Sequence, residues 1–396
     1  MPRALMEAFP VTSPAAESVL RTVLMAGGPT SRAAIGHRAG LSAAAVTKAI
    51  RPLLSAGLVV ERGPGSAGTP GVGRPVSLIA AEPAAAYFAG IKITANEVVA
   101  VCMDLAGQVR ASEHVAVGSH APDAIVGQVA TAYRQLLAAP PVAAHRVRCV
   151  GVSVSGDVDR TGGRVRHSPF LGWRDVPLAR LVGEATRAAA VIENDVRALT
   201  LAEQWWGLGA GATSLAVVTV GAGIGCGLLI DGRVLVGAHG VSGELGHLPL
   251  GDPELTCYCG RRGCVETVAS AGAVLRRIGA ATGRTPGSLA EAGALARTGA
   301  PAATEAFVTA GRVIGLAVAS VVNLVGPERV VITGEGVPAF EPYLDEIRRT
   351  FAEHAFGAAV RAEIAARPLP FAEWARGAAT VALDGAILAS RGRRTA

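Results

Sequence analysis

Apolar runs typical of β-strands alternate with helical stretches along most of the chain, and this alternation limits the possible folds more than any other feature. The runs at Tyr87–Thr94, Val98–Asp104 and Val147–Val154 predict strands, whereas Pro122–Leu137 and Leu178–Ala190 predict helices. Strands that alternate with helices in this way predict an α/β fold.

The same alternation begins a second time near residue 214, with paired strands through Val236, helices over roughly residues 265–315 and a strand at Arg329–Thr333. Two rounds indicate two lobes with a cleft. We place these lobes at residues 87–200 and 201–385, and expect the C-terminal helix to return to the first lobe.

Neither apolar segment of the chain predicts a membrane span. Gln204–Ile230 carries no charge but contains seven glycines, which is typical of strand and turn, and Val313–Val325 is too short to cross a bilayer. The first residues also lack an apolar stretch long enough for a signal peptide. We therefore expect a cytoplasmic protein with no membrane partner.

Residues 13–80 predict a separate head. A helix at Ser18–Met25 is followed by a second helix that ends at Gly40 and by a third that Ser42 caps. Two short helices joined by a glycine turn have the spacing of a helix-turn-helix.

A β-hairpin follows these helices. Leu58–Val60 and Val76–Ile79 predict strands, and Arg62–Pro75 between them is rich in Gly and Pro, as expected of a flexible wing. The segment therefore predicts a winged helix-turn-helix DNA-binding domain. The alternative is a small helical domain that docks on another protein.

Charge supports DNA as the partner of the head. Residues 1–80 hold eight Lys or Arg against three Glu, a formal charge of +5, and the whole chain carries +6. A basic head on a nearly neutral body suggests a polyanionic partner, although a soluble surface that happens to be basic remains the alternative. The polar and basic residues that we expect to contact DNA, from the third helix and the wing, are Ser42, Thr47, Lys48, Arg51 and Arg74.

Three of the six cysteines, Cys257, Cys259 and Cys264, lie within eight residues. Disulfides across such short spacings are strained, and a cytosolic chain would keep these thiols reduced. Metal binding is the better explanation, and a reactive redox cluster is the alternative.

Seven motifs occur in an order that resembles the ROK family (repressors, open reading frames, kinases) over essentially the whole chain. They are Gly151–Gly156, Ser168–Trp173, Glu193–Asp195, Gly221–Gly227, Gly243–His247, Cys257–Glu266 and Ile332–Gly336. The resemblance implies an actin-like, two-lobed ATPase fold, which the repressor branch of the family extends with an N-terminal winged helix-turn-helix.

The resemblance also implies two sets of ligands. One imidazole and three thiols would bind a structural Zn²⁺ with no open position, through His247, Cys257, Cys259 and Cys264. The residues that would converge on sugar hydroxyls are Asn194, Asp195, Glu244, His247 and Glu266.

The nucleotide motifs of the family are degraded in this chain. In the family, the first phosphate loop reads Asp-x-Gly-Gly-Thr-Lys. The corresponding residues of this chain are Lys92–Glu97, which include neither glycine. The second loop keeps its glycines but has Ala222 at the hydroxyl position. In a kinase Asp195 would be the general base, but phosphoryl transfer depends on positioning and charge neutralisation, so we expect no catalytic residue here.

The sequence therefore predicts a sugar-responsive transcriptional regulator, most simply a repressor. We expect a homodimer or homotetramer whose paired heads bind a palindromic double-stranded operator, with a small sugar as effector. The alternatives are a sugar kinase with residual ATP-dependent activity and an inert scaffold.

Overall fold

The computed structural model describes residues 11, 13–63, 77–140 and 142–389. The chain divides into two compact units, Met1–Trp206 with Ala372–Ala396, and Gly207–Phe371. The lobe boundary predicted after residue 200 falls inside helix α7 (Asp195–Trp206), and the division lies at the end of that helix. The predicted head shares the first unit with the first lobe.

Three helices and a small antiparallel sheet form the head. The helices are α2 (Pro14–Met25), α3 (Arg32–Ala39) and α4 (Ala43–Ser55), and the strands, in spatial order, are β1 (Thr30–Ser31), β3 (Leu78–Ala81) and β2 (Val59–Arg62). Each helix begins after a serine whose hydroxyl accepts a backbone N–H, namely Ser13, Ser31 and Ser42. Gly40 adopts the left-handed conformation that ends α3. These helices and strands match the winged helix-turn-helix that the sequence predicts, and residues 64–75 of the predicted wing lie outside the described residues.

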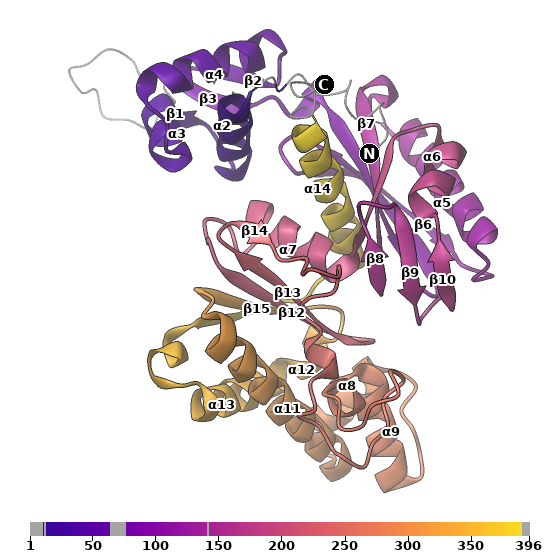
Figure 1. Cartoon of the computed structure of the whole chain (residues 1–396). Helices are drawn as coiled ribbons and strands as arrows, with labels where there is room; N and C mark the ends of the chain where they lie inside the picture. The colour runs from indigo at the N-terminus through magenta and orange to yellow at the C-terminus, as the bar shows by residue number, and fades with distance from the viewer. Residues whose placement is uncertain (1–10, 12, 64–76, 141, 390–396) are drawn as a thin grey trace. The chain divides into compact units, whose positions relative to one another are not determined.

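A five-stranded sheet forms the centre of the first lobe. Its strands, in spatial order, are β11 (Ala190–Asn194), β7 (Val147–Val154), β4 (Tyr87–Ile93), β5 (Glu97–Asp104) and β6 (Val109–Ala116). Alternate apolar side chains of these strands pack against α5 (Pro122–Ala138) and α6 (Leu178–Thr186), shown in Figure 1. The helix predicted over Leu178–Ala190 was too long, because Arg187 adopts a left-handed conformation and β11 already begins at Ala190.

Helix α14 (Phe371–Ala389) covers the opposite face of this sheet, which two glycines make possible. A Cβ atom on Gly90 would lie 2.0 Å from the Ala375 carbonyl oxygen, and one on Gly151 would lie 1.9 Å from that of Ala378. The backbones of helix and strand therefore approach more closely than any side chain would permit.

A short antiparallel sheet extends the first lobe near the ends of β7 and β11. It consists of β8 (Asp157–Asp159), β9 (Arg164–Ser168) and β10 (Trp173–Val176), with β9 in the middle. Trp173 is buried in the same apolar core as α5 and α6. Val158 of β8 belongs to the same core, so this packing holds the small sheet against the first lobe.

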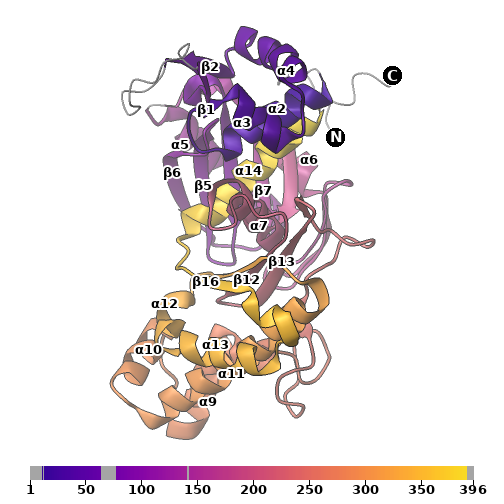
Figure 2. The ribbon, with the colours of Figure 1, turned by 90° about the vertical axis from the view of Figure 1, so that its left-hand side faces the viewer.

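The second unit is built on another five-stranded sheet. Its strands, in spatial order, are β14 (Arg233–Val234), β13 (Ile224–Ile230), β12 (Leu215–Val220), β15 (Arg329–Thr333) and β16 (Glu363–Ala366). Its helices, gathered below the sheet in Figures 1 and 2, are α8 (Glu266–Ala269), α9 (Ala271–Thr282), α10 (Leu289–Arg297), α11 (Pro301–Val325), α12 (Val337–Phe340) and α13 (Leu344–His354). One apolar core joins the sheet to these helices.

Helix α11 is the one helix of the described residues that is long and apolar enough to cross a membrane. Half of the residues in its most apolar window are buried inside the protein. Its buried face includes Phe307, Ile314 and Val318, which lie in the core of the second unit. This burial accounts for the apolar composition of α11 without a membrane.

Candidate metal and sugar sites

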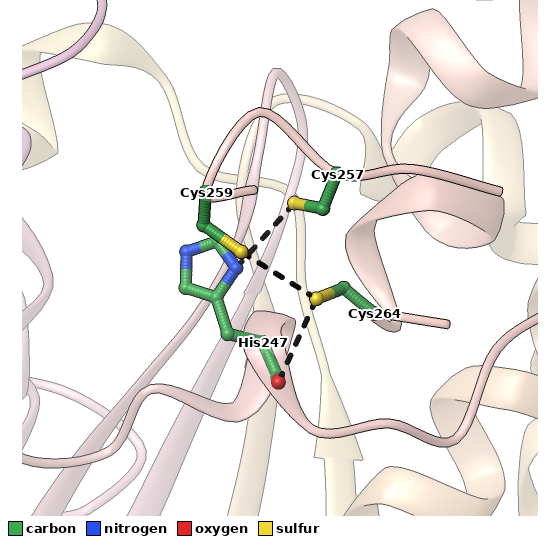
Figure 3. A group of neighbouring side chains, drawn as sticks. All are labelled: His247, Cys257, Cys259 and Cys264. Carbon is green, nitrogen blue, oxygen red and sulfur yellow. Dashed lines mark hydrogen bonds between the residues drawn. The ribbon is translucent and has the colours of Figure 1, made fainter. Parts of the chain in front are cut away.

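The four predicted metal ligands lie together in the second unit. His247 ends the short 3₁₀ turn Leu245–His247, and the three cysteines follow on a loop that doubles back towards it (Figure 3). Their potential ligand atoms all lie within 4.8 Å of one another. The Sγ atoms of Cys259 and Cys264 are 3.7 Å apart, and Cys257 Sγ is 3.7 Å from His247 Nδ1.

These separations fit a tetrahedral ion. Zn–S bonds of about 2.3 Å give S···S edges of about 3.8 Å in a regular tetrahedron. Cys257 and Cys264 are buried and Cys259 is exposed, so the set is closed on its protein side. Three thiols and one imidazole match the donor preference of Zn²⁺, whereas Ca²⁺ and Mg²⁺ prefer oxygen ligands.

The second imidazole nitrogen of His247 has a partner that sequence reasoning missed. Tyr258, between the first two cysteines, places its hydroxyl 3.1 Å from His247 Nε2, and the two rings meet edge to face. Tyr258 is 57% exposed, so its phenol covers the imidazole from the solvent side.

The two predicted sugar-binding glutamates of the second unit lie close to this cluster. Glu266 follows the last cysteine, and its carboxylate accepts weakly from the Ile224 amide at 3.5 Å. Burial, with a contribution from the nearby Glu244 carboxylate, raises the pKa of Glu266 to about 7. Partial burial raises the pKa of the Tyr258 hydroxyl, and the negative charges of both carboxylates raise it further. One polar group at the metal loop therefore consists of Glu244, Glu266, His247 and Tyr258.

Asn194 lies at the junction of β11 and α7 in the first unit. Its Oδ1 accepts the amides of Val196 and Arg197 at 3.0 and 3.1 Å, and so caps α7. Its Nδ2 donates to the Gly156 carbonyl at 3.0 Å. Asn194 therefore holds the loop before β8 against the first turn of α7.

Asp195 is buried and has charged and polar partners. Its Oδ2 accepts from the Lys92 ammonium and, at 2.6 Å, from the Ser155 hydroxyl. Burial alone would raise the pKa of Asp195, but the Lys92 charge and the hydrogen bonds from Lys92, Ser155 and the Val196 amide hold it below its ordinary value. Asp195 is therefore ionised at neutral pH and already engaged.

Lys92 is the partner of Asp195 that sequence reasoning missed. It points from β4 towards Asp195, is only 4% exposed, and lies 5.3 Å from the ring centre of Trp374 on α14. The charged form of a buried ammonium group is stabilised by its carboxylate partner and by the face of the aromatic ring.

The predicted DNA contacts differ in their availability. Lys48 and Arg51 are exposed on α4, in the second helix of the helix-turn-helix. Ser42 and Thr47 are also exposed, but their hydroxyls bond within α4, to the Ala45 amide and the Ala43 carbonyl. Arg74 lies outside the described residues. The exposed charges among the predicted contacts of α4 are therefore those of Lys48 and Arg51.

A model of the ROK family matches residues 88–384, which is most of the chain. The chain belongs to the ROK family. Its relatives in this family include a xylose repressor of Caldicellulosiruptor bescii, 26% identical over 85% of this chain and 87% of the relative. NagC of Escherichia coli, a DNA-binding transcriptional dual regulator, is 27% identical over 78% of this chain and 77% of its own length.

Solved ROK structures support the same assignment. A ROK transcriptional regulator homologous to Escherichia coli Mlc superposes with a TM-score of 0.77 at 25% identity, over 97% of this chain and 98% of the other. ROK sugar kinases also match, over 75% of this chain. The predicted fold, a winged helix-turn-helix followed by a two-lobed actin-like ATPase domain, is confirmed.

The second ROK phosphate loop of this chain bonds to an internal carboxylate. Glu335 Oε1 accepts the backbone N–H of Ala222 at 2.8 Å, and a Cβ on Gly221 would lie 2.0 Å from the same oxygen. Free backbone amides in a glycine loop are what a phosphate needs. Glu335, which follows Gly334 in the last ROK motif, therefore satisfies one such amide and adds negative charge beside the loop.

The first ROK phosphate loop is a tight β-turn between β4 and β5. Thr94 Oγ1 accepts the amides of Asn96 and Glu97 at 3.2 and 3.0 Å. Glu97 in turn pairs with His114 at 2.9 Å. The turn thus uses its own amides internally.

Proposed function

We propose that this ROK protein is a sugar-responsive transcriptional regulator, most simply a repressor, and that it does not act as a sugar kinase. The observation that carries the proposal is the buried ion pair of Lys92 and Asp195 in a chain that begins with a winged helix-turn-helix. The head provides a DNA-binding domain, and the ion pair makes Asp195 unsuitable as the general base of a kinase.

The ion pair acts against catalysis in two ways. A general base must accept a proton from the substrate hydroxyl, but Lys92 stabilises the carboxylate of Asp195 and lowers its pKa, which makes it a weaker base. Asp195 Oδ2 also already accepts from Ser155. Its other oxygen, Oδ1, accepts from the Val196 amide but can still accept from a sugar hydroxyl, so binding remains possible.

The nucleotide side supports the same conclusion. A triphosphate carries several negative charges, which a kinase neutralises with amides, cations and Mg²⁺. Here Glu335 occupies the Ala222 amide, and the first loop ends in Glu97. Two carboxylates at these loops would repel phosphate rather than bind it.

We infer that the remaining parts serve sensing. Zn²⁺ bound by His247, Cys257, Cys259 and Cys264 would hold His247 and Glu266 in place for the sugar. Asn194, Asp195, Glu244, His247 and Glu266 would contact its hydroxyls. Ser42, Thr47, Lys48, Arg51 and Arg74 would face the operator.

A homodimer or homotetramer would place two heads on a palindromic site, with half-sites about one helical turn apart. The setting would be cytoplasmic, where the operator and the imported sugar are both present.

The function is tested by two measurements on the full chain. A panel of xylose, glucose, N-acetylglucosamine and their phosphates is screened for a rise in melting temperature. Duplexes that the protein selects from fragmented genomic DNA are then titrated with and without the stabilising sugar. The proposal requires a sequence-specific duplex whose affinity the sugar changes. An inert scaffold would show neither effect.

Removal of the basic face of α4 is expected to impair operator binding specifically. In the Lys48→Ala/Arg51→Ala variant, the Kd for the selected duplex should rise about 10- to 100-fold, because phosphate or base contacts are lost. Both residues are exposed, so the melting temperature and the sugar affinity should stay unchanged. The matched control is Arg180→Ala, which removes an exposed arginine of α6, and a similar loss in that variant would contradict the assignment.

The kinase alternative makes the opposite prediction. Coupled release of ADP from MgATP, measured with each sugar of the panel, is expected to stay at the background of a sample without protein. Turnover within the usual range of about 1–100 s⁻¹ would overturn the proposed function in favour of a kinase.

A further inference from the structure

The first helix of the head and the last helix of the first lobe share an ion pair. Arg21 on α2 donates from Nη2 to Asp384 Oδ1 on α14 at 2.7 Å. Asp384 is 7% exposed, so this contact is largely shielded from solvent. The Nε atom of Arg21 also contacts Glu17 of its own helix at 3.2 Å. Arg21 is thus fixed on both sides, by the head and by the lobe.

Asp384 has a second arginine partner, which lies near the predicted sugar ligands of the first lobe. Arg160 follows β8, and its Nη2 lies 3.4 Å from Asp384 Oδ2. Its Nη1 lies 3.6 Å from Glu193 Oε2 on β11. The carboxylate of Asp384 therefore separates two arginines, one from the head and one from the loop after β8.

Glu193 immediately precedes the two predicted sugar ligands of this unit, Asn194 and Asp195. It is buried and pairs with Arg197 at 2.7 Å, while Arg197 also donates to the Val158 carbonyl of β8 at 3.2 Å. Movement of β11 or β8 on sugar binding would therefore shift Arg160 directly.

A second connection reaches Arg21 through α7. The guanidinium carbon of Arg21 lies 5.2 Å from the ring centre of Trp205, which is buried near the end of α7. Asp195 is the first residue of the same helix. A rigid helix transmits a displacement of its first turn to its last, so Arg21 also contacts a helix that begins at a predicted sugar ligand.

We propose that Asp384, bridging Arg21 and Arg160, transmits occupancy of the sugar site to the DNA-binding head. Glu193, Arg160, Asp384 and Arg21 act as positioning residues, distinct from the predicted contacts with sugar and DNA. In one arrangement Asp384 pairs with both arginines and the head is docked on α14. A sugar that displaces β11 and Arg160 alters the Arg160–Asp384 contact and thereby the strength of the Arg21–Asp384 ion pair. The equilibrium between docked and undocked heads then shifts.

This inference rests on the proposed function and is tested by Asp384→Asn in the full chain. Asparagine keeps the size of the side chain but removes the carboxylate between Arg21 and Arg160, so that Arg21 keeps only Glu17 and Arg160 only Glu193 as a charged partner. In the wild type, the sugar should change the operator Kd by at least about tenfold, within the ordinary range of allosteric coupling. In the variant this change should fall below about twofold, with the sugar affinity and the zinc content retained.

Arg21→Gln provides an independent second variant, because Arg21 is partly exposed and its loss leaves Asp384 paired with Arg160. It should abolish the coupling in the same way, and hydrogen exchange of α2 should become insensitive to sugar in both variants. The control is Arg180→Gln, which breaks an exposed pair with Glu184 on α6 and should leave the coupling intact.

Two outcomes would overturn the inference, and they are distinguishable. If the wild type responds to sugar and Arg21→Gln, folded and with normal sugar affinity, responds equally, the inference fails and the proposed function stands. If the wild type selects no duplex and binds no sugar of the panel, both fail. A merely structural role for the bridge would lower the melting temperature of the variants without changing the ratio of operator affinities.

Discussion

Replacement of Cys259 by Ser is expected to abolish the zinc binding that we propose and to destabilise the second unit by more than about 4 kcal/mol, the size of effect that loss of a structural metal produces. In zinc-finger peptides the binding free energy of the metal is about 10 kcal/mol or more. Cys259 is exposed, so the substitution itself deletes little packing, and the loss should come from the metal.

The measurement is zinc per chain by elemental analysis, together with thermal unfolding with and without a chelator. Zinc should fall from near one per chain to near zero, and the chelator should lower the melting temperature of the wild type but not of the variant. Sugar binding should be lost as well, because the metal loop also positions His247 and Glu266.

A matched control is Cys149→Ala, which removes a buried cysteine outside the metal loop. This variant should keep its zinc, whatever it loses in packing. A Cys259→Ser protein that binds sugar normally and melts at the wild-type temperature would refute the role that we assign to the metal.

Replacement of Asp195 by Asn is expected to lower the free energy of unfolding by about 3–5 kcal/mol, because it leaves the buried ammonium of Lys92 without its counter-charge. Sugar affinity should fall by about 10- to 100-fold, as expected when a charged acceptor of hydrogen bonds is lost. Denaturant unfolding and calorimetric titration with the stabilising sugar measure the two effects.

The double variant Lys92→Met/Asp195→Asn separates these effects. Removal of both charges should restore much of the lost stability, since methionine can still pack against Trp374, but sugar affinity should stay low. Recovery of both properties in the double variant would show that Asp195 serves only to pair with Lys92.

The pair also has a defined pH dependence. Folding lowers the pKa of Asp195, so the pair contributes its stability fully above the ordinary carboxyl value of 3.8. That contribution is lost as the pH falls below 3.8 and through the lowered pKa. The stability difference between the wild type and Asp195→Asn should therefore be constant near neutral pH and shrink in acid.

Much of the architecture could be predicted from local pattern. The strands at Val147–Val154 and Arg329–Thr333 begin and end where apolar periodicity placed them. The helix predicted over Leu178–Ala190 was wrong at its end, because Val191 and Ile192 continue an apolar run that periodicity alone does not divide into helix and strand.

The candidate sites divide in the same way. His247 and the three cysteines could be predicted because residues of metal-binding types lie close together in one short segment of the sequence. The contact of Tyr258 with His247 could not, although its place between two metal ligands was a signal that was available. The bond from the Ala222 amide to Glu335 joins residues 113 positions apart, and no local pattern marks it.

The sequence by itself determined the order of domains, the candidate metal ligands and the degraded phosphate loops, because each depends on residue types that are close together in the chain. Only the tertiary structure decided that Lys92, 103 positions from Asp195, neutralises it, and that Asp384 lies between Arg21 and Arg160. Charges interact over a few ångströms, and the folding of distant segments onto one sheet sets which charges come that close.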